Sequence, residues 1–185
     1  YLEKTGAMQQ TVLIVADSLA ALPLAFLAPY SGAAVAEYFW EHDSDVVVIY
    51  DDLASHAKIY REMSLLGDAS PGRESFPGDM FYRHSSLLER AGKVQGTERS
   101  LTVLPIMTTS NNDITSFLST ALISITDGQL VFDTEEMQKG STPPVNVGLS
   151  VSRVGGRAQE ALQKAMAQEI FVTLSSYRQA SEFAH

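Results

Sequence analysis

Apolar residues along the chain form two patterns: short β-branched runs, and longer stretches with apolar residues at helical spacing. The runs predict buried strands at Thr11–Ala16, at Asp45–Tyr50, at Ser100–Met107, within Ala121–Phe132 and at Val145–Val151. The longer stretches predict helices within Leu19–Trp40, at Leu53–Leu66 (stopping at Gly67), at Met80–Ala91 and at Gln159–Phe183. Strands that alternate with helices favour an α/β fold, with a mostly parallel sheet flanked by helices on both faces.

Three local features refine this outline. Because Pro23 and Pro29 interrupt the first helical stretch, we expect its regular part to start after Pro29. Residues 70–79 (SPGRESFPGD) are rich in turn formers. Leu162, Met166 and Ile170 recur at helical spacing in the last helix, so we expect them to face a core.

Composition narrows the possible functions. The chain has 185 residues, 45% of them hydrophobic and 19% charged, which is typical of one globular domain. A net charge of -9 argues against binding to nucleic acid or an anionic membrane. The chain has no cysteine, which excludes a disulfide framework, a thiolate zinc site and a cysteine nucleophile. No apolar run is long enough to cross a bilayer.

A carboxylate pair, Asp51 and Asp52, follows the predicted strand Asp45–Tyr50. An apolar strand that ends in Asp has the form of a Walker B segment, whose carboxylate holds Mg²⁺ of a bound nucleotide, usually through water. The alternative is that Asp52 caps the next helix and Asp51 begins a loop. The phosphate loop GxxxxGK[ST], which would cradle the nucleotide, does not occur in this sequence.

A second candidate is Arg153, which lies between small residues in the segment 146–156 (NVGLSVSRVGG). Small neighbours let a ligand or another backbone approach, and a guanidinium can bind a phosphate bidentately. The alternative is an ordinary salt-bridging arginine.

Other polar residues suggest no site. The four histidines (His42, His56, His84 and His185) lack metal-ligand spacing. Asp52 and His56 stand four residues apart on one predicted helix, and we interpret them as a surface pair. Glu135 and Glu136 are adjacent, so they point in different directions and are interpreted as solvated.

Several segments together resemble the α subunits of the rotary F-type ATP synthase. The resemblance spans essentially the whole chain in order, and the strings that carry it are FLAPYSG (26–32), YDDL (50–53), PGRE with FPGD (71–79), LLERA (87–91), ISITDGQ (123–129) and NVGLSVSRVG (146–155). Catalytic β subunits, vacuolar-type B subunits and flagellar export ATPases do not combine these strings.

The resemblance implies a P-loop NTPase (RecA-like) fold and a non-catalytic, regulatory subunit that binds ATP or ADP with Mg²⁺. It implies that Arg153 is an arginine finger, which reaches the γ-phosphate on a neighbouring β subunit. Ser124, with Ile123 and Val151, would face that same catalytic nucleotide. Asp51 would hold Mg²⁺ through water at the chain's own nucleotide site, and Pro143 would lie near that nucleotide.

The resemblance also implies an assembly and a place in the cell. The partners would be β subunits in an alternating α3β3 ring, the γ shaft and the δ/b stalk. The complex would couple ATP synthesis or hydrolysis to proton transport. The chain would lie peripheral to the energy-coupling membrane, attached only through other subunits, on the cytoplasmic face in a bacterium or on the matrix or stroma side in an organelle.

We expect the chain to be a fragment: residues 1–156 would be the part of the nucleotide-binding domain after the phosphate loop, and residues 157–185 a helix leading toward a C-terminal helical domain. Such a fragment would be inactive alone. An alternative, suggested by Met137 and Thr142 where the family has an aromatic residue and an arginine, is a degenerate structural paralogue that keeps the ring interface without binding nucleotide. A further alternative is a stand-alone or export-type ATPase.

Overall fold

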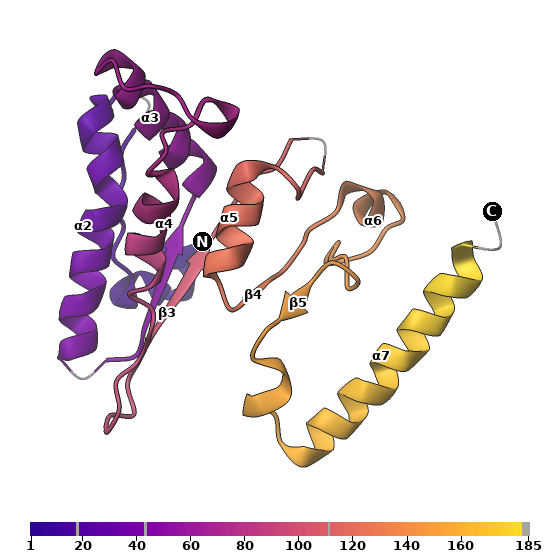
Figure 1. Cartoon of the computed structure of the whole chain (residues 1–185). Helices are drawn as coiled ribbons and strands as arrows, with labels where there is room; N and C mark the ends of the chain where they lie inside the picture. Colours follow the sequence, from indigo (N-terminus) through magenta and orange to yellow (C-terminus); the bar gives the residue numbers. More distant parts are fainter. Residues whose placement is uncertain (18, 43, 111, 183–185) are drawn as a thin grey trace. The chain divides into compact units, whose positions relative to one another are not determined.

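A computed structural model of the chain describes residues 1–17, 19–42, 44–110 and 112–182 (Figure 1). It divides into two compact units, Tyr1–Thr126 and Asp127–His185. The helices of eight or more residues are α2 (Leu22–Glu41), α3 (Leu53–Leu66), α4 (Met80–Leu88), α5 (Phe117–Ile125) and α7 (Ala161–Glu182). The shorter α-helices are α1 (Leu2–Thr5) and α6 (Thr134–Gln138), and the strands are β1 (Val46–Tyr50), β2 (Gly92–Lys93), β3 (Ser100–Pro105), β4 (Gly128–Gln129) and β5 (Val151–Ser152).

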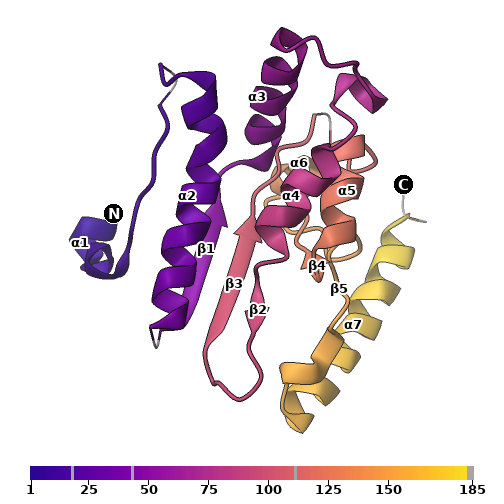
Figure 2. The same ribbon diagram turned by 60° about the vertical axis from the view of Figure 1, so that its left-hand side comes forward.

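The first unit is built on a three-stranded sheet in the order β1-β3-β2. β1 and β3 run parallel, with Val46 opposite Leu101 and Tyr50 opposite Pro105, whereas β2 joins β3 antiparallel. Figure 2 shows the parallel pair with α2 beside β1. The predicted parallel pairing is therefore confirmed for the two longest strands.

One face of this sheet carries the core. Side chains alternate along β1, so that Val48 and Tyr50 turn inward while Val47 and Ile49 are exposed. The inward face packs against residues from four helices, and the buried members of this cluster are Ala33, Tyr50, Leu53, Leu87, Leu88 and Leu122. The helices α2, α3, α4 and α5 thus contribute to one core, whereas helices were expected on both faces.

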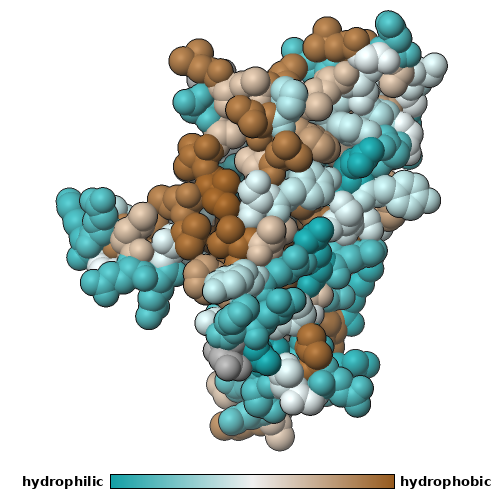
Figure 3. Space-filling view, turned by 90° about the vertical axis from the view of Figure 1, so that its left-hand side faces the viewer, coloured by the Kyte–Doolittle hydropathy of each residue, from teal (hydrophilic) through white to brown (hydrophobic). Residues whose placement is uncertain are grey.

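The outward face stays uncovered in the part of the chain that is described. Val47 and Ile49 of β1 and Leu104 of β3 are exposed there. An open groove of about 1210 Å³ is lined by β1, α2 and residues of the segment 9–16. Hydrophobic side chains gather into a patch on the side of the molecule seen in Figure 3.

Two predicted elements in the N-terminal part differ in the structure. Residues 11–16 form no strand, because a β-branched run needs a hydrogen-bonded neighbour, and the described part of the chain pairs β1 only with β3. α2 begins at Leu22, before Pro29, because Pro23 fits the first turn of a helix. Pro29 then lies inside the helix, where it removes one backbone hydrogen bond.

The predicted strand within Ala121–Phe132 is wrong for its first half. Residues 117–125 form α5, because the hydroxyl oxygen of Ser116 accepts from the backbone N–H of Ser119 and caps the helix. Leu118 and Leu122, four residues apart, then turn to the core. Only the two residues of β4 are strand in this segment.

The second unit holds the two-stranded antiparallel sheet of β4 and β5. The predicted strand Val145–Val151 is reduced to a single bridge between Val145 and Phe132 and to the start of β5. The last helix is present as α7, although Phe183, at its predicted end, lies outside the described residues. Leu162, Met166 and Ile170 are exposed, so the expectation that they face a core is wrong for this chain.

The core accounts for a first prediction. Leu87 is 0% exposed in the main cluster, whereas Leu66 at the end of α3 is 75% exposed. Leu87→Ala should lower the free energy of unfolding by about 2–5 kcal/mol because it leaves a cavity. Leu66→Ala should cost less than about 0.5 kcal/mol. Urea unfolding measures both, and equal losses would contradict the core assigned here.

Candidate functional site

The end of β1 places the two aspartates differently. Asp51 is exposed, while Asp52 is half-buried at the N-terminus of α3. The Asp52 carboxylate accepts the backbone N–H of Ser55 at 2.6 Å and the hydroxyl of Thr108 at 2.9 Å. The helix-cap interpretation of Asp52 is therefore confirmed, which leaves Asp51 as the carboxylate that faces solvent.

Backbone hydrogen bonds fix this edge. The N–H of Ile106 donates to the carbonyl of Tyr50 at 2.9 Å, and the N–H of Leu53 donates to the carbonyl of Ile106 at 3.0 Å. These bonds continue the parallel pairing of β1 and β3 past the last strand residues. Asp51 thus projects from a part of the backbone that is held on both sides.

Burial alone would raise the pKa of Asp52, but the hydrogen bonds from Ser55 and Thr108 outweigh it. The pKa of Asp52 consequently lies below its ordinary value. The ionised carboxylate is the form that accepts these bonds, so the cap is in place at neutral pH.

Ile123 and Ser124 lie near the end of α5. Ser124 is exposed, and its hydroxyl donates to the carbonyl of Thr120 at 2.8 Å. The N-terminus of this helix is tied to the turn-rich segment, since the Glu74 carboxylate accepts the N–H of Phe117 at 3.0 Å. The PGRE string thus contacts the N-terminus of α5, and the ISITDGQ string begins at the C-terminal end of the same helix.

Val151 begins β5 in the second unit, and Arg153 directly follows this strand. Both are exposed, and the backbone N–H of Arg153 donates to the carbonyl of Asp127 at 2.7 Å. A Cβ at Gly128 would stand 2.6 Å from the Val151 carbonyl oxygen, so only glycine permits β4 and β5 to approach this closely. The glycine of ITDGQ thus holds the strand that presents Arg153.

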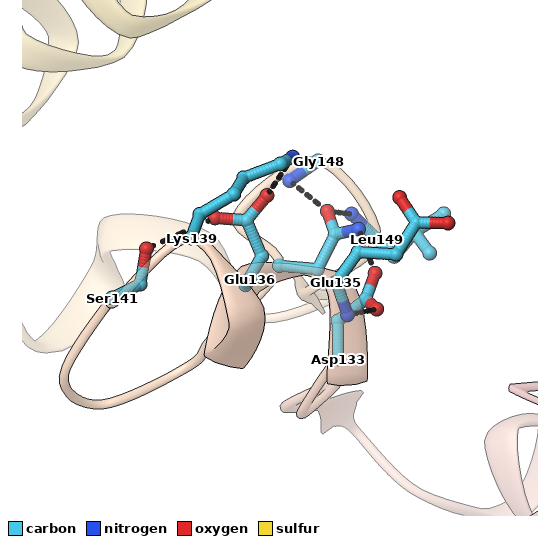
Figure 4. Close-up of polar contacts among 8 residues, drawn as sticks. Asp133, Glu135, Glu136, Lys139, Ser141, Gly148 and Leu149 are labelled. Carbon is cyan, nitrogen blue, oxygen red and sulfur yellow. Dashed lines mark hydrogen bonds and ion pairs between the residues drawn. The ribbon is translucent and has the colours of Figure 1, made fainter.

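The loop before β5 is organised by Asn146, to which the sequence analysis gave no role. Its side-chain amide donates to the Asp133 carboxylate at 3.0 Å. Its side-chain oxygen accepts the N–H groups of Gly148 and Leu149 at 3.1 and 3.2 Å. Figure 4 shows these contacts. A short Asx side chain just before a Gly-containing turn is the sequence signal that points to such a role.

The same view shows the contacts of α6. Glu136 pairs with Lys139 at 3.0 Å and accepts the hydroxyl of Ser141 at 3.2 Å (Figure 4). Glu136 is therefore a half-buried residue that anchors the loop, and the interpretation of it as solvated is wrong, whereas Glu135 is exposed as expected. Pro143 follows in the loop, exposed, after a cis peptide bond with Thr142.

The proposed residues thus form three groups: Asp51 at the end of β1, Ile123 and Ser124 on α5, and Pro143, Val151 and Arg153 in the second unit. One interpretation from the sequence is wrong. His56, expected on the surface with Asp52, is buried and only 4% exposed.

The comparison with protein families decides the relationship. Residues 1–152 match the ATP synthase alpha/beta family, nucleotide-binding domain. The chain belongs to this family. Its members in the comparison include proteins named ATP synthase subunit alpha, which confirms the resemblance seen in the sequence.

Three of these relatives show how far the similarity extends. The chain is 50% identical over 184 residues to ATP synthase subunit alpha of Petrotoga mobilis, and 46% identical over 196 residues to that of Vesicomyosocius okutanii. It is 46% identical over 184 residues to the mitochondrial subunit alpha of Dictyostelium citrinum. The matches cover 98–99% of this chain but 36–38% of the relatives.

The acidic residues bear on whether a member of the ATP synthase alpha/beta family could hold a metal ion here. Among the described residues, no group of three or more His, Cys, Asp or Glu could bind a metal ion. Asp51 alone still fits Mg²⁺, which prefers one or two carboxylates completed by water and phosphate oxygens.

None of the described helices is long and apolar enough to span a membrane.

The cap predicts a pH-dependent stability. Asp52→Ala should cost about 0.5–2 kcal/mol of unfolding free energy at pH 7 because it removes the helix cap. Asp52→Asn should cost less, since asparagine also caps, and Asp51→Ala should change little.

The sign of the pH dependence follows from the lowered pKa of Asp52. Its contribution is complete above the unfolded pKa of about 3.9 and is lost as the pH falls through the folded value. The difference between wild type and Asp52→Ala should therefore shrink below about pH 4. Chemical denaturation from pH 7 to pH 3 measures it, and a difference that grew in acid would contradict the cap.

Proposed function

We propose that this chain is part of an α subunit of a rotary ATP synthase, which binds nucleotide without turning it over and completes a neighbour's catalytic site with Arg153. The observation that carries the proposal is the similarity to α subunits along 98–99% of the chain, which includes the segment that presents Arg153. We also propose that residues 1–156 belong to a RecA-like nucleotide-binding domain, and that residues 157–185 lead toward a helical domain.

Arg153 has the surroundings that a trans-acting arginine needs. Its side chain is exposed, so it can reach another subunit, while its backbone is fixed to Asp127 and its strand is held close to Gly128. A guanidinium supplied to phosphoryl transfer stabilises the negative charge that spreads over the transferred group. Because the strand is held in place beforehand, less entropy is lost when the side chain engages the phosphate. Ser124, Ile123 and Val151 would line the same interface.

Asp51 would hold Mg²⁺ through water at the chain's own nucleotide site. The metal would neutralise phosphate charge when bound. The contribution of Asp51 is a fixed, solvent-facing carboxylate at the carboxyl end of a parallel strand, where α/β sheets bind their ligands. Pro143 would lie near the ATP or ADP held there.

The partners in this proposal are β subunits, which alternate with α in an α3β3 ring, the γ shaft and the δ/b stalk. The assembly would couple ATP synthesis or hydrolysis to proton transport, with the chain peripheral to the membrane on its cytoplasmic, matrix or stroma side. Relatives from bacteria and from a mitochondrion support this range of locations.

The arginine finger predicts a kinetic effect. In the natural protein assembled with β and γ subunits, Arg153→Ala should lower kcat for ATP hydrolysis by roughly 10³-fold or more because the transition state loses its guanidinium. Arg153→Lys should restore only part of the loss, since an ammonium cannot bind bidentately. Steady-state ATPase assays on assemblies of verified stoichiometry measure both.

Arg157 provides a matched control, because it is an exposed arginine four residues further on. Arg157→Ala should leave kcat within about twofold. Equal effects of Arg153→Ala and Arg157→Ala would contradict the finger. Unchanged activity in both would instead favour a structural paralogue that only completes the ring.

The Mg²⁺ role of Asp51 predicts a separate effect. Asp51→Asn should weaken nucleotide binding to the non-catalytic site by about tenfold in the presence of Mg²⁺ and little in EDTA, because the change removes a charge that acts through the metal. A fluorescent ATP analogue measures the affinity. Loss of affinity in both conditions, or in neither, would remove Asp51 from that role.

A further inference from the structure

Two buried histidines lie where α2, α3 and α4 meet. His56 is 4% exposed and His84 is 1% exposed, and their ring centroids are 5.6 Å apart. Phe26 of α2 stacks on His56 with centroids 4.9 Å apart, and Tyr30 approaches the same ring at 6.0 Å. The pair therefore joins three helices through ring contacts.

The polar atoms of this pair are poorly satisfied. Within the described residues, neither ring nitrogen of His56 has a hydrogen-bond partner, and Nε2 of His84 has none. The carbonyl of Leu53 faces His84 and favours its charged form. The carbonyl of Phe26 faces His56 and favours its charged form, but it does not meet hydrogen-bond geometry. Neutral imidazoles tolerate such a site far better than imidazolium ions do.

Among the residues that the structure describes, no carboxylate on the surrounding elements is placed to compensate a charge here. Glu37 of α2 pairs with Arg90, Asp79 before α4 binds Tyr60 and Arg83, and Asp52 is taken by its cap. The exposed side chains of Glu41, Lys58 and Glu62 face solvent.

The other groups around the two histidines do not stabilise a positive charge on them either. Tyr50 of β1 is held neutral, since burial raises its pKa to about 12, and α5 has no ionisable side chain. His56 also lies in the first turn of α3, where the positive end of the helix dipole opposes a second positive charge. Stacking on Phe26 would favour a charged His56 ring. A second charge on the neighbouring His84 ring, however, would repel it.

We propose that His56 and His84 form a proton-sensitive latch, which holds α2, α3 and α4 together while both rings are neutral and releases them when acid protonates the pair. Because His56 lies in the first turn of α3, which Asp52 caps, release would also loosen the end of β1. The latch does not depend on nucleotide binding.

The direction of the effect follows from burial. Burial lowers the pKa of His84 to about 4, with the charge of His56 as the second cause, and burial also lowers the pKa of His56. The opened state, with an ordinary histidine pKa of about 6.5, therefore takes up protons first as the pH falls. The stabilisation is complete above about pH 6.5 and is lost between about pH 6.5 and pH 4.

The absence of cysteine in the chain provides a reporter. Ala33, 3% exposed, faces the core from α2, and its neighbour Ala34 is exposed on the same helix. Single Ala33→Cys and Ala34→Cys variants of the full chain can be labelled with a thiol reagent. The ratio of the two labelling rates reports opening, because the pH dependence of the thiol itself largely cancels.

We expect this ratio to rise roughly 30-fold or more from pH 7.5 to pH 5, because a histidine with a pKa of about 4 in the closed state and 6.5 in the open state favours opening by that factor. The rise should fall below about threefold when His56→Leu and His84→Asn are combined, since neither leucine nor asparagine titrates. His42→Gln, which removes an exposed histidine, should leave the full rise.

A ratio that stays flat with pH, or that rises equally in the double histidine variant, would overturn the latch. If the double variant does not fold, the unsubstituted chain still decides the question. In NMR of the closed state, the ring signal of His84 should stay that of neutral imidazole down to pH 5, and His56 should titrate below its ordinary range. Titration of either ring near pH 6.5 without opening would overturn the proposal.

Discussion

The parallel pairing of β1 with β3 is the constraint on which the first unit depends. It sets Val48 and Tyr50 on one face of the sheet, and the helices of the first unit pack against that face to form the core. It also brings Ile106 beside the end of β1, where two backbone bonds hold the turn that carries Asp51. A slip of one residue would turn the inward face outward and remove both the core and the carboxylate edge.

The second unit depends on a close approach of two backbones. Gly128 lets β4 and β5 meet, and Asn146 ties the preceding loop to Asp133. Both residues belong to strings that carry the resemblance to α subunits, and both support β5, which Arg153 directly follows. In the proposed role of Arg153, the backbone would thus be held in place for a side chain whose target lies on another subunit, as trans-acting catalysis requires.

The sequence was sufficient to predict those elements whose ends are set by neighbouring residues in the chain. The helix Leu53–Leu66 could be predicted to the residue, with Asp52 as its cap and Gly67 as its end. The prediction of a strand at 121–125 was wrong, because these apolar residues suit a strand as well as a helix. The helix cap at Ser116 favours the helix. The burial of His56 could not be predicted, since it depends on Phe26 and His84 from two other helices. The role proposed for Arg153 rests on the resemblance to α subunits, because the exposed position of an arginine does not by itself indicate what the side chain binds.

The central claim is that Arg153 acts on a nucleotide held by a neighbouring subunit. The most direct measurement is a structure of the natural protein assembled with β and γ subunits and loaded with a transition-state analogue of ATP hydrolysis. The account predicts the Arg153 guanidinium within about 3 Å of the oxygens that mimic the transferred phosphate, at a catalytic site of β. A guanidinium directed away from the nucleotide at every α–β interface would contradict it.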